Sequence, residues 1–188
     1  MQAGIFRLRG YTLRLFDNSS VGHSLCSACQ VETTTAEERQ LKWDLRYLRQ
    51  ARGIATECSK DPSTKTGAVI VDSDGGLVST GFNGFARKVK DTPERYADRD
   101  TKIAMILHCE ENAILFAERW RLKGATLYTW PFMSCAKCAG MVVQVGISRC
   151  VAPPLPAHLQ ERWGKNIELA KMQFEEAGVQ LDIIEVTE

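Results

Sequence analysis

The feature that most constrains the fold is a pair of short motifs, each at the start of a predicted helix. A His-x-Glu motif, His108 and Glu110, opens the segment "HCEENAILFA". A Cys-x-x-Cys motif, Cys135 and Cys138, follows some 25 residues later in "SCAKCAG". Both motifs stand at predicted strand-to-helix junctions, so the chain must bring two such junctions into one structure.

The residue types in the two motifs match a catalytic zinc site. A lone histidine near an apolar run is usually a core residue, and a lone Cys-x-x-Cys can be redox-active, so the interpretation depends on their conjunction. Two thiolates and one imidazole give zinc three protein ligands, which is the open coordination of catalytic sites. The free N–H groups and the positive end of a helix favour thiolate over thiol at Cys135 and Cys138.

Glu110 stands next to the predicted metal without being needed as a ligand. There it can take a proton from zinc-bound water and pass it on, which is general acid/base catalysis. H-x-E…P-C-x-x-C is the signature of zinc nucleobase deaminases. Ser134 occupies the position of the motif's proline. Serine is a good N-cap, and we expect its side chain to hold the helix start by a hydrogen bond.

Composition limits the class of protein. A chain of 188 residues is long enough for one domain with a substantial core. A formal net charge of +1 argues against a nucleic-acid partner. No apolar run approaches the roughly 20 residues that a membrane span needs, and the first 30 residues lack a secretory signal. Seven cysteines, an odd number, suit ligands or core residues in a reducing compartment, so we expect a cytoplasmic protein.

Residues 1–34 differ in composition from the rest of the chain. They are rich in arginine, poor in acidic residues and without periodicity, which indicates an appendage or a partly disordered arm preceding one domain over 35–188. An arginine-rich start also resembles an organelle transit peptide. His23, Cys26 and Cys29 could form a second, structural zinc site, but no fourth ligand is obvious nearby. We interpret them as an incidental cluster.

The apolar pattern after residue 34 predicts an α/β fold. A β-hairpin is expected from "TGAVIVD" and "LVSTGF", joined by the turn "SDGG", and a long polar segment with local helix follows it. The other predicted elements are a helix after "TTT", a helix from about Cys109 to Arg121, the strand "ATLYTW", a helix opening near Cys135, the strand "SRCVA", a helix over about 157–177 ended by Gly178, and the strand "VQLDIIEV". This order implies a mixed sheet covered by helices on both faces.

Four segments resemble the deoxycytidylate (dCMP) deaminase family in order and spacing, over roughly residues 40–185. They are "SKDPSTKTGAVIVD", "STGFNGF", "HCEENAIL" and "TLYTWPFMSCAKCAGMVVQVGISRCV". The resemblance implies a cytidine-deaminase-like three-layer α/β/α sandwich with a mixed sheet of about five strands. It also implies zinc-dependent hydrolytic deamination of dCMP to dUMP for thymidylate supply.

The resemblance assigns further residues and partners. It implies that Asn112 contacts the sugar hydroxyl and that Asn83 lies in the loop for nucleotide recognition. In regulated members the "GFNG" motif contributes to a site for dCTP or dTTP, with magnesium accompanying the triphosphate effector. The family also implies a homo-oligomer, often a hexamer.

Other candidates come from the residues themselves. Lys65, Arg87 and Lys88 could hold a 5′-phosphate, although surface cations are more often only solvated. Phe132 and Trp130 end a predicted strand and could stack on a base or belong to the core; we favour the pocket for Phe132.

Two other functions stay open. The same zinc chemistry could serve a different carrier: dCTP, modified dCMP, a nucleoside or adenosine in tRNA. A non-catalytic zinc-binding assembly module is the alternative from another class, supported only by Ser134. Glu110 argues against that module, because a structural zinc site has no use for its carboxylate.

Overall fold

The computed structural model describes residues 7–8, 11–12 and 35–186. Contacts divide the chain into two units, residues 1–34 and 35–188. In the first unit, β1 (Arg7–Leu8) and β2 (Tyr11–Thr12) pair antiparallel. The predicted cluster of His23, Cys26 and Cys29 lies outside the described residues.

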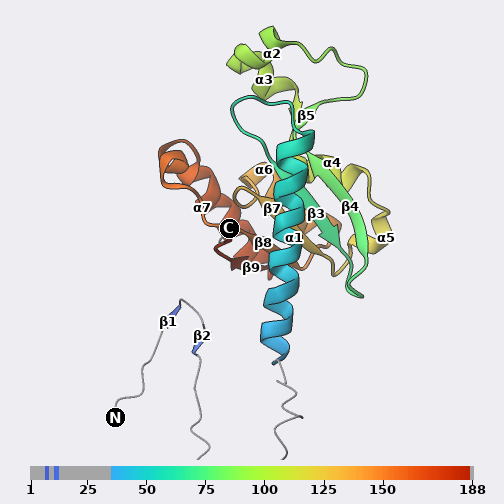
Figure 1. The fold of residues 1–188 in the computed structure, drawn as a ribbon, viewed down its shortest axis with the longest axis vertical. Coiled ribbons are helices and arrows are strands. Elements are labelled where there is room, and N and C mark those ends of the chain that lie inside the picture. The colour runs from blue at the N-terminus through green and yellow to red at the C-terminus, as the bar shows by residue number, and fades with distance from the viewer. Residues whose placement is uncertain (1–6, 9–10, 13–34, 187–188) are drawn as a thin grey trace, which may run out of the picture. The chain divides into compact units, whose positions relative to one another are not determined.

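The second unit is built on the predicted mixed five-stranded sheet, in the order β4-β3-β7-β8-β9 (Figure 1). β3 is antiparallel to both of its neighbours, β4 and β7, whereas β7, β8 and β9 are parallel. The strands are β3 (Gly67–Val71), β4 (Leu77–Phe82), β7 (Thr126–Trp130), β8 (Arg149–Ala152) and β9 (Gln180–Ile183).

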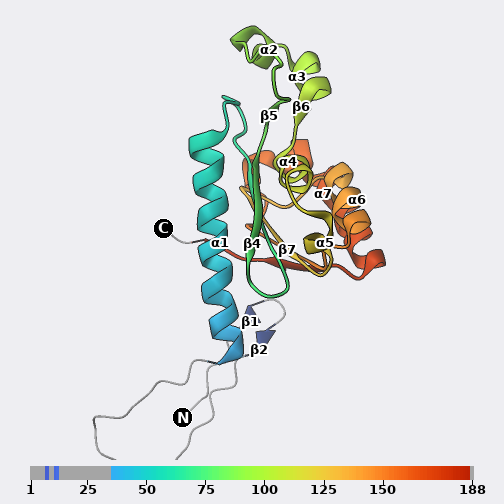
Figure 2. The same ribbon diagram turned by 90° about the vertical axis from the view of Figure 1, so that its right-hand side faces the viewer.

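Helices cover both faces of this sheet, which confirms the three-layer α/β/α architecture. One face carries α1 (Ala36–Cys58), and the other carries α4 (Cys109–Leu115), α6 (Ala136–Val145) and α7 (Gln160–Ala177) (Figure 2). Side chains alternate between the two faces along each strand. Val69 packs with Leu48 of α1, whereas its neighbour Ile70 packs in the cluster formed with α4, α6 and α7.

Two glycines let helices lie close to the sheet. A Cβ on Gly67 would overlap the carbonyl oxygen of Ala51 in α1, and a Cβ on Gly81 would overlap the carbonyl oxygen of Cys109. Only glycine allows backbones to approach this closely. Gly81 therefore sets where α4 begins, directly after His108.

The polar segment after β4 contains local helix, as predicted. It holds α2 (Pro93–Ala97) and α3 (Arg99–Met105), which project beyond the sheet (Figure 1). Its two ends pair as β5 (Gly84–Phe85) and β6 (Ile106–Leu107). β6 leads directly into His108.

Two helix predictions were wrong in detail. The predicted helix from Cys109 to Arg121 is broken, because α4 ends at Leu115 and a short α5 (Arg119–Leu122) follows. The chain turns between them so that Leu122 enters the core, which is a tertiary effect without a local breaker. The helix predicted over 157–177 begins as a 3₁₀ turn, η1 (Ala157–Leu159), and ends at Gly178 in the left-handed region, φ +71°.

A buried ion-pair network ties α1 to the sheet. Asp44 accepts both guanidinium arms of Arg149 at 2.7 and 2.8 Å and the hydroxyl of Tyr128 at 2.8 Å. Arg149 also donates to Asp182 of β9 at 2.7 Å. One carboxylate thus joins the first helix to three strands. In the described part of the chain, no helix combines the length and the apolar character that crossing a membrane requires.

Candidate metal centre and active-site cavity

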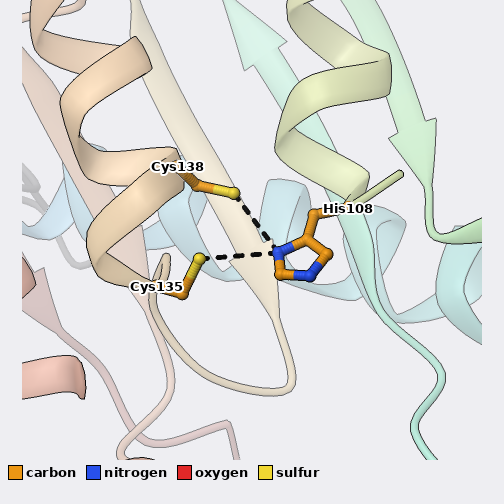
Figure 3. A group of neighbouring side chains, drawn as sticks. All are labelled: His108, Cys135 and Cys138. Atoms are coloured by element: carbon orange, nitrogen blue, oxygen red, sulfur yellow. Dashed lines mark hydrogen bonds between the residues drawn. The ribbon is translucent and has the colours of Figure 1, made fainter. Parts of the chain in front are cut away.

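The structure brings together the three predicted metal ligands. His108 is the N-cap residue of α4, Cys135 is the N-cap residue of α6, and Cys138 lies in the first turn of α6. Nδ1 of His108 lies 3.5 Å from Sγ of Cys135 and 3.4 Å from Sγ of Cys138 (Figure 3). All three ligand atoms lie within 4.8 Å of one another.

This spacing fits zinc. Tetrahedral coordination with Zn–S of ~2.3 Å and Zn–N of ~2.0 Å separates a nitrogen ligand from a sulfur ligand by about 3.5 Å. The two N···S separations, 3.5 and 3.4 Å, match this value. A set of two sulfurs and one imidazole nitrogen also has the softness that zinc prefers over magnesium or calcium.

The electrostatics of the ligand set favour a cation. A hydrogen bond from Cys138, against the opposing effect of burial and helped by His108, lowers the pKa of Cys135 to about 4. The hydrogen bond between His108 and Cys135 raises the pKa of His108 to about 9. A second hydrogen bond, between Cys138 and Cys135, raises the pKa of Cys138 together with burial. One sulfur is therefore a thiolate before any metal binds, and a metal would displace the protons on the other two ligands.

The start of α6 is held differently from our expectation. Ser134 does not cap the helix: its buried hydroxyl finds no hydrogen-bond partner among the described residues. Instead Asn166 of α7 accepts the backbone N–H of Ala136 at 2.7 Å, and Gln173 of α7 donates to the Ala136 carbonyl at 2.9 Å. The prediction was wrong because a neighbouring helix supplies the acceptor that a local serine would otherwise provide.

The two adjacent glutamates of "HCEE" have separate surroundings. Glu111 accepts the backbone N–H of His108 at 2.6 Å and pairs with Lys137 at 2.9 Å. Burial alone would raise the pKa of Glu111, but these two contacts outweigh burial and lower the pKa. Glu110 is buried, accepts the Cys109 thiol at 3.1 Å and lines the cavity beside the metal ligands. Glu111 positions His108, a role that the sequence reasoning missed, and Glu110 faces the cavity.

A cavity of about 360 Å³ is lined by two of the three ligands, His108 and Cys135. Its walls come from the 61–66 loop, from α3 and β6 on the projecting segment, and from α7, with Phe132 and Met133 before α6. A volume of this size suits a small organic ligand. Four of its lining residues are cationic: Arg99, Lys102, Lys137 and Arg162.

Three of the candidate substrate contacts line this cavity: Phe132, Trp130 and Asn83. The ring of Phe132 lies 5.5 Å from that of Trp163. The amide of Asn83 already has partners: the oxygen accepts from Ser59 at 2.7 Å and from the Thr66 N–H at 2.8 Å, and the nitrogen donates to the Thr64 carbonyl at 2.8 Å. In this structure Asn83 holds the loop that forms one wall.

The other three predicted contacts are not among the residues that line the cavity. Asn112 donates to the Phe82 carbonyl at 2.7 Å and so ties α4 to β4. Lys65 donates to the Thr56 carbonyl at 2.9 Å on the surface. The guanidinium of Arg87 lies 4.6 Å from the ring centroid of Phe116. The structure does not bring Lys65 or Arg87 to the cavity.

A buried ion pair at the cavity wall was not predicted from the sequence. Lys102 of α3 contacts Asp61 at 2.7 Å, and both side chains are largely buried. Asp61 also accepts the backbone N–H of Ser63 at 2.8 Å, a local turn that "DPS" could have indicated. The partner, Lys102, is 41 residues away in a polar segment, and no sequence pattern pairs the two.

Comparisons with known proteins agree with this geometry. The model of the cytidine and deoxycytidylate deaminase zinc-binding region matches residues 41–153. An "Uncharacterized deaminase in luxG 3'region" of Aliivibrio fischeri is 39% identical over 140 residues, covering 74% of this chain and 92% of that protein. A "Probable deoxycytidylate deaminase" of Drosophila melanogaster is 37% identical over 119 residues, or 58% of each chain.

Solved structures share the fold. The dCMP deaminase from the cyanophage S-TIM5 in apo form has a TM-score of 0.56 at 18% identity, covering 76% of this chain and 98% of that one. The same protein in complex with dCMP and dUMP has a TM-score of 0.54 at 17% identity, covering 80% and 99%. At this level of identity the similarity concerns the fold alone.

Proposed function

This chain belongs to the cytidine and deoxycytidylate deaminase family, and from this premise we propose that it converts dCMP to dUMP by hydrolytic deamination. Relatives named deoxycytidylate deaminase, at 30–38% identity in animals, support this choice of substrate. A relative of higher identity is named only as a deaminase.

One observation carries the proposal. The ligand atoms of His108, Cys135 and Cys138 lie close together, and His108 and Cys135 line the same cavity as Glu110. A structural zinc site is closed by four protein ligands, whereas a set of three leaves a position for water. An acidic side chain beside that position suits proton transfer.

His108, Cys135 and Cys138 would hold zinc, which when bound acts as a Lewis acid that lowers the pKa of water. Hydrolytic deamination replaces the amino group at carbon 4 of cytosine with oxygen from water and releases ammonia. One group must therefore take a proton from the water and return it to the departing nitrogen. We assign both transfers to Glu110, which lines the cavity, because Glu111 is already bound to His108 and Lys137.

The remaining walls suit a nucleotide. Phe132 and Trp163 offer aromatic surface next to the cysteines, where a flat base can pack. The two lining cations that are not paired with a carboxylate of the described residues, Arg99 and Arg162, favour a ligand that carries negative charge, such as a 5′-phosphate. Asn83 and Asp61 would act by holding the 61–66 loop against the ligand.

A substrate panel tests the proposal. Cytidine, CMP, dCMP, dCTP and 5-methyl-dCMP are incubated with zinc-loaded protein, and loss of the amino-pyrimidine is followed by ultraviolet absorbance. We expect dCMP to have the highest kcat/KM. Preference for cytidine, CMP, dCTP or 5-methyl-dCMP would contradict dCMP as substrate while leaving the zinc chemistry in place.

Regulation and assembly are proposed from the family resemblance alone. We expect a homo-oligomer, with dCTP and dTTP as magnesium-dependent effectors. Light scattering gives the oligomeric state, and dCMP saturation curves with and without each triphosphate test the control.

A further inference from the structure

The four cations that line the cavity differ in what neutralises them. Lys102 is paired with Asp61 at 2.7 Å, and Lys137 is paired with Glu111 at 2.9 Å. Arg99 and Arg162 have no carboxylate partner among the residues that the structure describes. An anionic ligand would therefore find two arginines whose charge is not already neutralised.

Of these two arginines, Arg162 is the one whose side chain contacts an aromatic residue of the cavity wall. Its guanidinium carbon lies 5.5 Å from the ring centroid of Trp163, whose ring packs against Phe132. One turn further along α7, Asn166 binds the start of the cysteine helix. Both arginines are exposed, but Arg99 lies on the short projecting helix α3 and has no aromatic ring contact among the described residues.

The cation–π contact with Trp163 does not use the N–H donors of Arg162, which stay available to an anion. A guanidinium that lies on an aromatic ring uses its face, whereas its N–H donors point outward in its own plane. Those donors match two oxygens of a phosphate, and a side chain that is already positioned loses less conformational entropy on binding.

We propose that Arg162, held on Trp163, binds the 5′-phosphate of the substrate and so determines the preference for a nucleotide over a nucleoside. This inference rests on the proposed function and replaces Lys65 and Arg87, which do not line the cavity. Arg162 and Trp163 lie beyond residues 41–153, the part that matches the family. The contact lies on α7, outside the matched zinc-binding region.

The test compares Arg162→Gln with Arg87→Gln. Arg87 is a matched control, because it is also an arginine stacked on an aromatic ring, that of Phe116, but away from the cavity. Calorimetry measures binding of dUMP and of deoxyuridine to the zinc-loaded proteins. Arg162→Gln should weaken dUMP binding about 10- to 100-fold and leave deoxyuridine binding unchanged. Arg87→Gln should bind both ligands like the wild type.

The inference is overturned if Arg162→Gln binds dUMP as tightly as the wild type, or if it loses affinity for dUMP and deoxyuridine equally. It is also overturned if Arg99→Gln, and not Arg162→Gln, loses affinity for dUMP. A wild-type protein that binds dUMP no more tightly than deoxyuridine would contradict it as well. Binding needs no turnover, so the result stands apart from the proposed function. If the wild type selects dUMP through Arg162 yet leaves dCMP unchanged, the proposed function fails and this inference holds.

Discussion

The side-chain oxygen of Asn166 accepts the backbone N–H of Ala136 at 2.7 Å, so α7 fixes the start of the helix that carries both cysteines. Asn166→Ala removes this cap, and we expect a loss of about 1 kcal/mol of unfolding free energy together with weaker zinc retention. Asn166→Asp keeps an acceptor and should restore most of the stability. Urea unfolding of the three proteins checks this, and equal midpoints would show that the contact does not hold α6.

Much of this site could be predicted from the sequence, because zinc ligands form local motifs at helix starts. His108, Cys135 and Cys138 meet as expected. The cap from Asn166 and the Lys102–Asp61 pair could not be predicted, since each joins residues that only the tertiary fold brings together.

The sheet and the helices on its two faces could also be predicted, from the pattern of apolar residues and from the turn residues between the elements. The break after Leu115 was not, because burial of Leu122 rather than a local signal ends the helix. Lys65 and Arg87, which we considered as phosphate contacts, do not line the cavity. A basic residue in the sequence does not indicate which way its side chain will point in the fold.

Zinc content depends on the three ligands. We expect about one zinc per chain by elemental analysis, and loss of it in Cys135→Ala together with a lower melting temperature, since metal binding stabilises the folded state. Cys58→Ala is the matched control, because that cysteine is exposed at the end of α1. Zinc lost equally from both variants would contradict the assignment.

Gly81 sets the position of α4. Gly81→Ala places a methyl group against the Cys109 carbonyl, so we expect a loss of roughly 2 kcal/mol or more of stability and a fall in activity as His108 shifts. Gly53→Ala lies in α1 with open space around the new methyl group and should stabilise by up to about 1 kcal/mol. Thermal unfolding measures the stability of both variants. Equal changes in melting temperature would contradict the close approach of Gly81 to the Cys109 carbonyl.

The Asp44 network makes stability depend on pH. Burial alone would raise the pKa of Asp44, but hydrogen bonds from Arg149, Gln40 and Tyr128 hold it below 3.8. The unfolded chain therefore takes up this proton first, and the stabilisation is present above pH ~4 and lost as the pH falls further.

Asp44→Asn should cost about 3 kcal/mol at pH 7, because Arg149 loses a buried partner. The difference from the wild type should shrink below pH 4. Urea titrations at pH 7 and pH 3 measure it, with Glu168→Gln, from the exposed Lys171–Glu168 pair, as a control near zero. A difference that stays constant with pH would count against the network.

The most direct test of the whole account is the initial rate of dCMP deamination by wild-type and Glu110→Gln protein, with zinc measured in the same samples. Glu110→Gln keeps the shape of the side chain and removes its ability to carry the proton. We predict that both proteins hold about one zinc per chain, that the wild type forms dUMP, and that the variant is slower by roughly 10²-fold or more. A zinc-loaded wild type that leaves dCMP unchanged, or a variant that remains nearly fully active, would contradict the account.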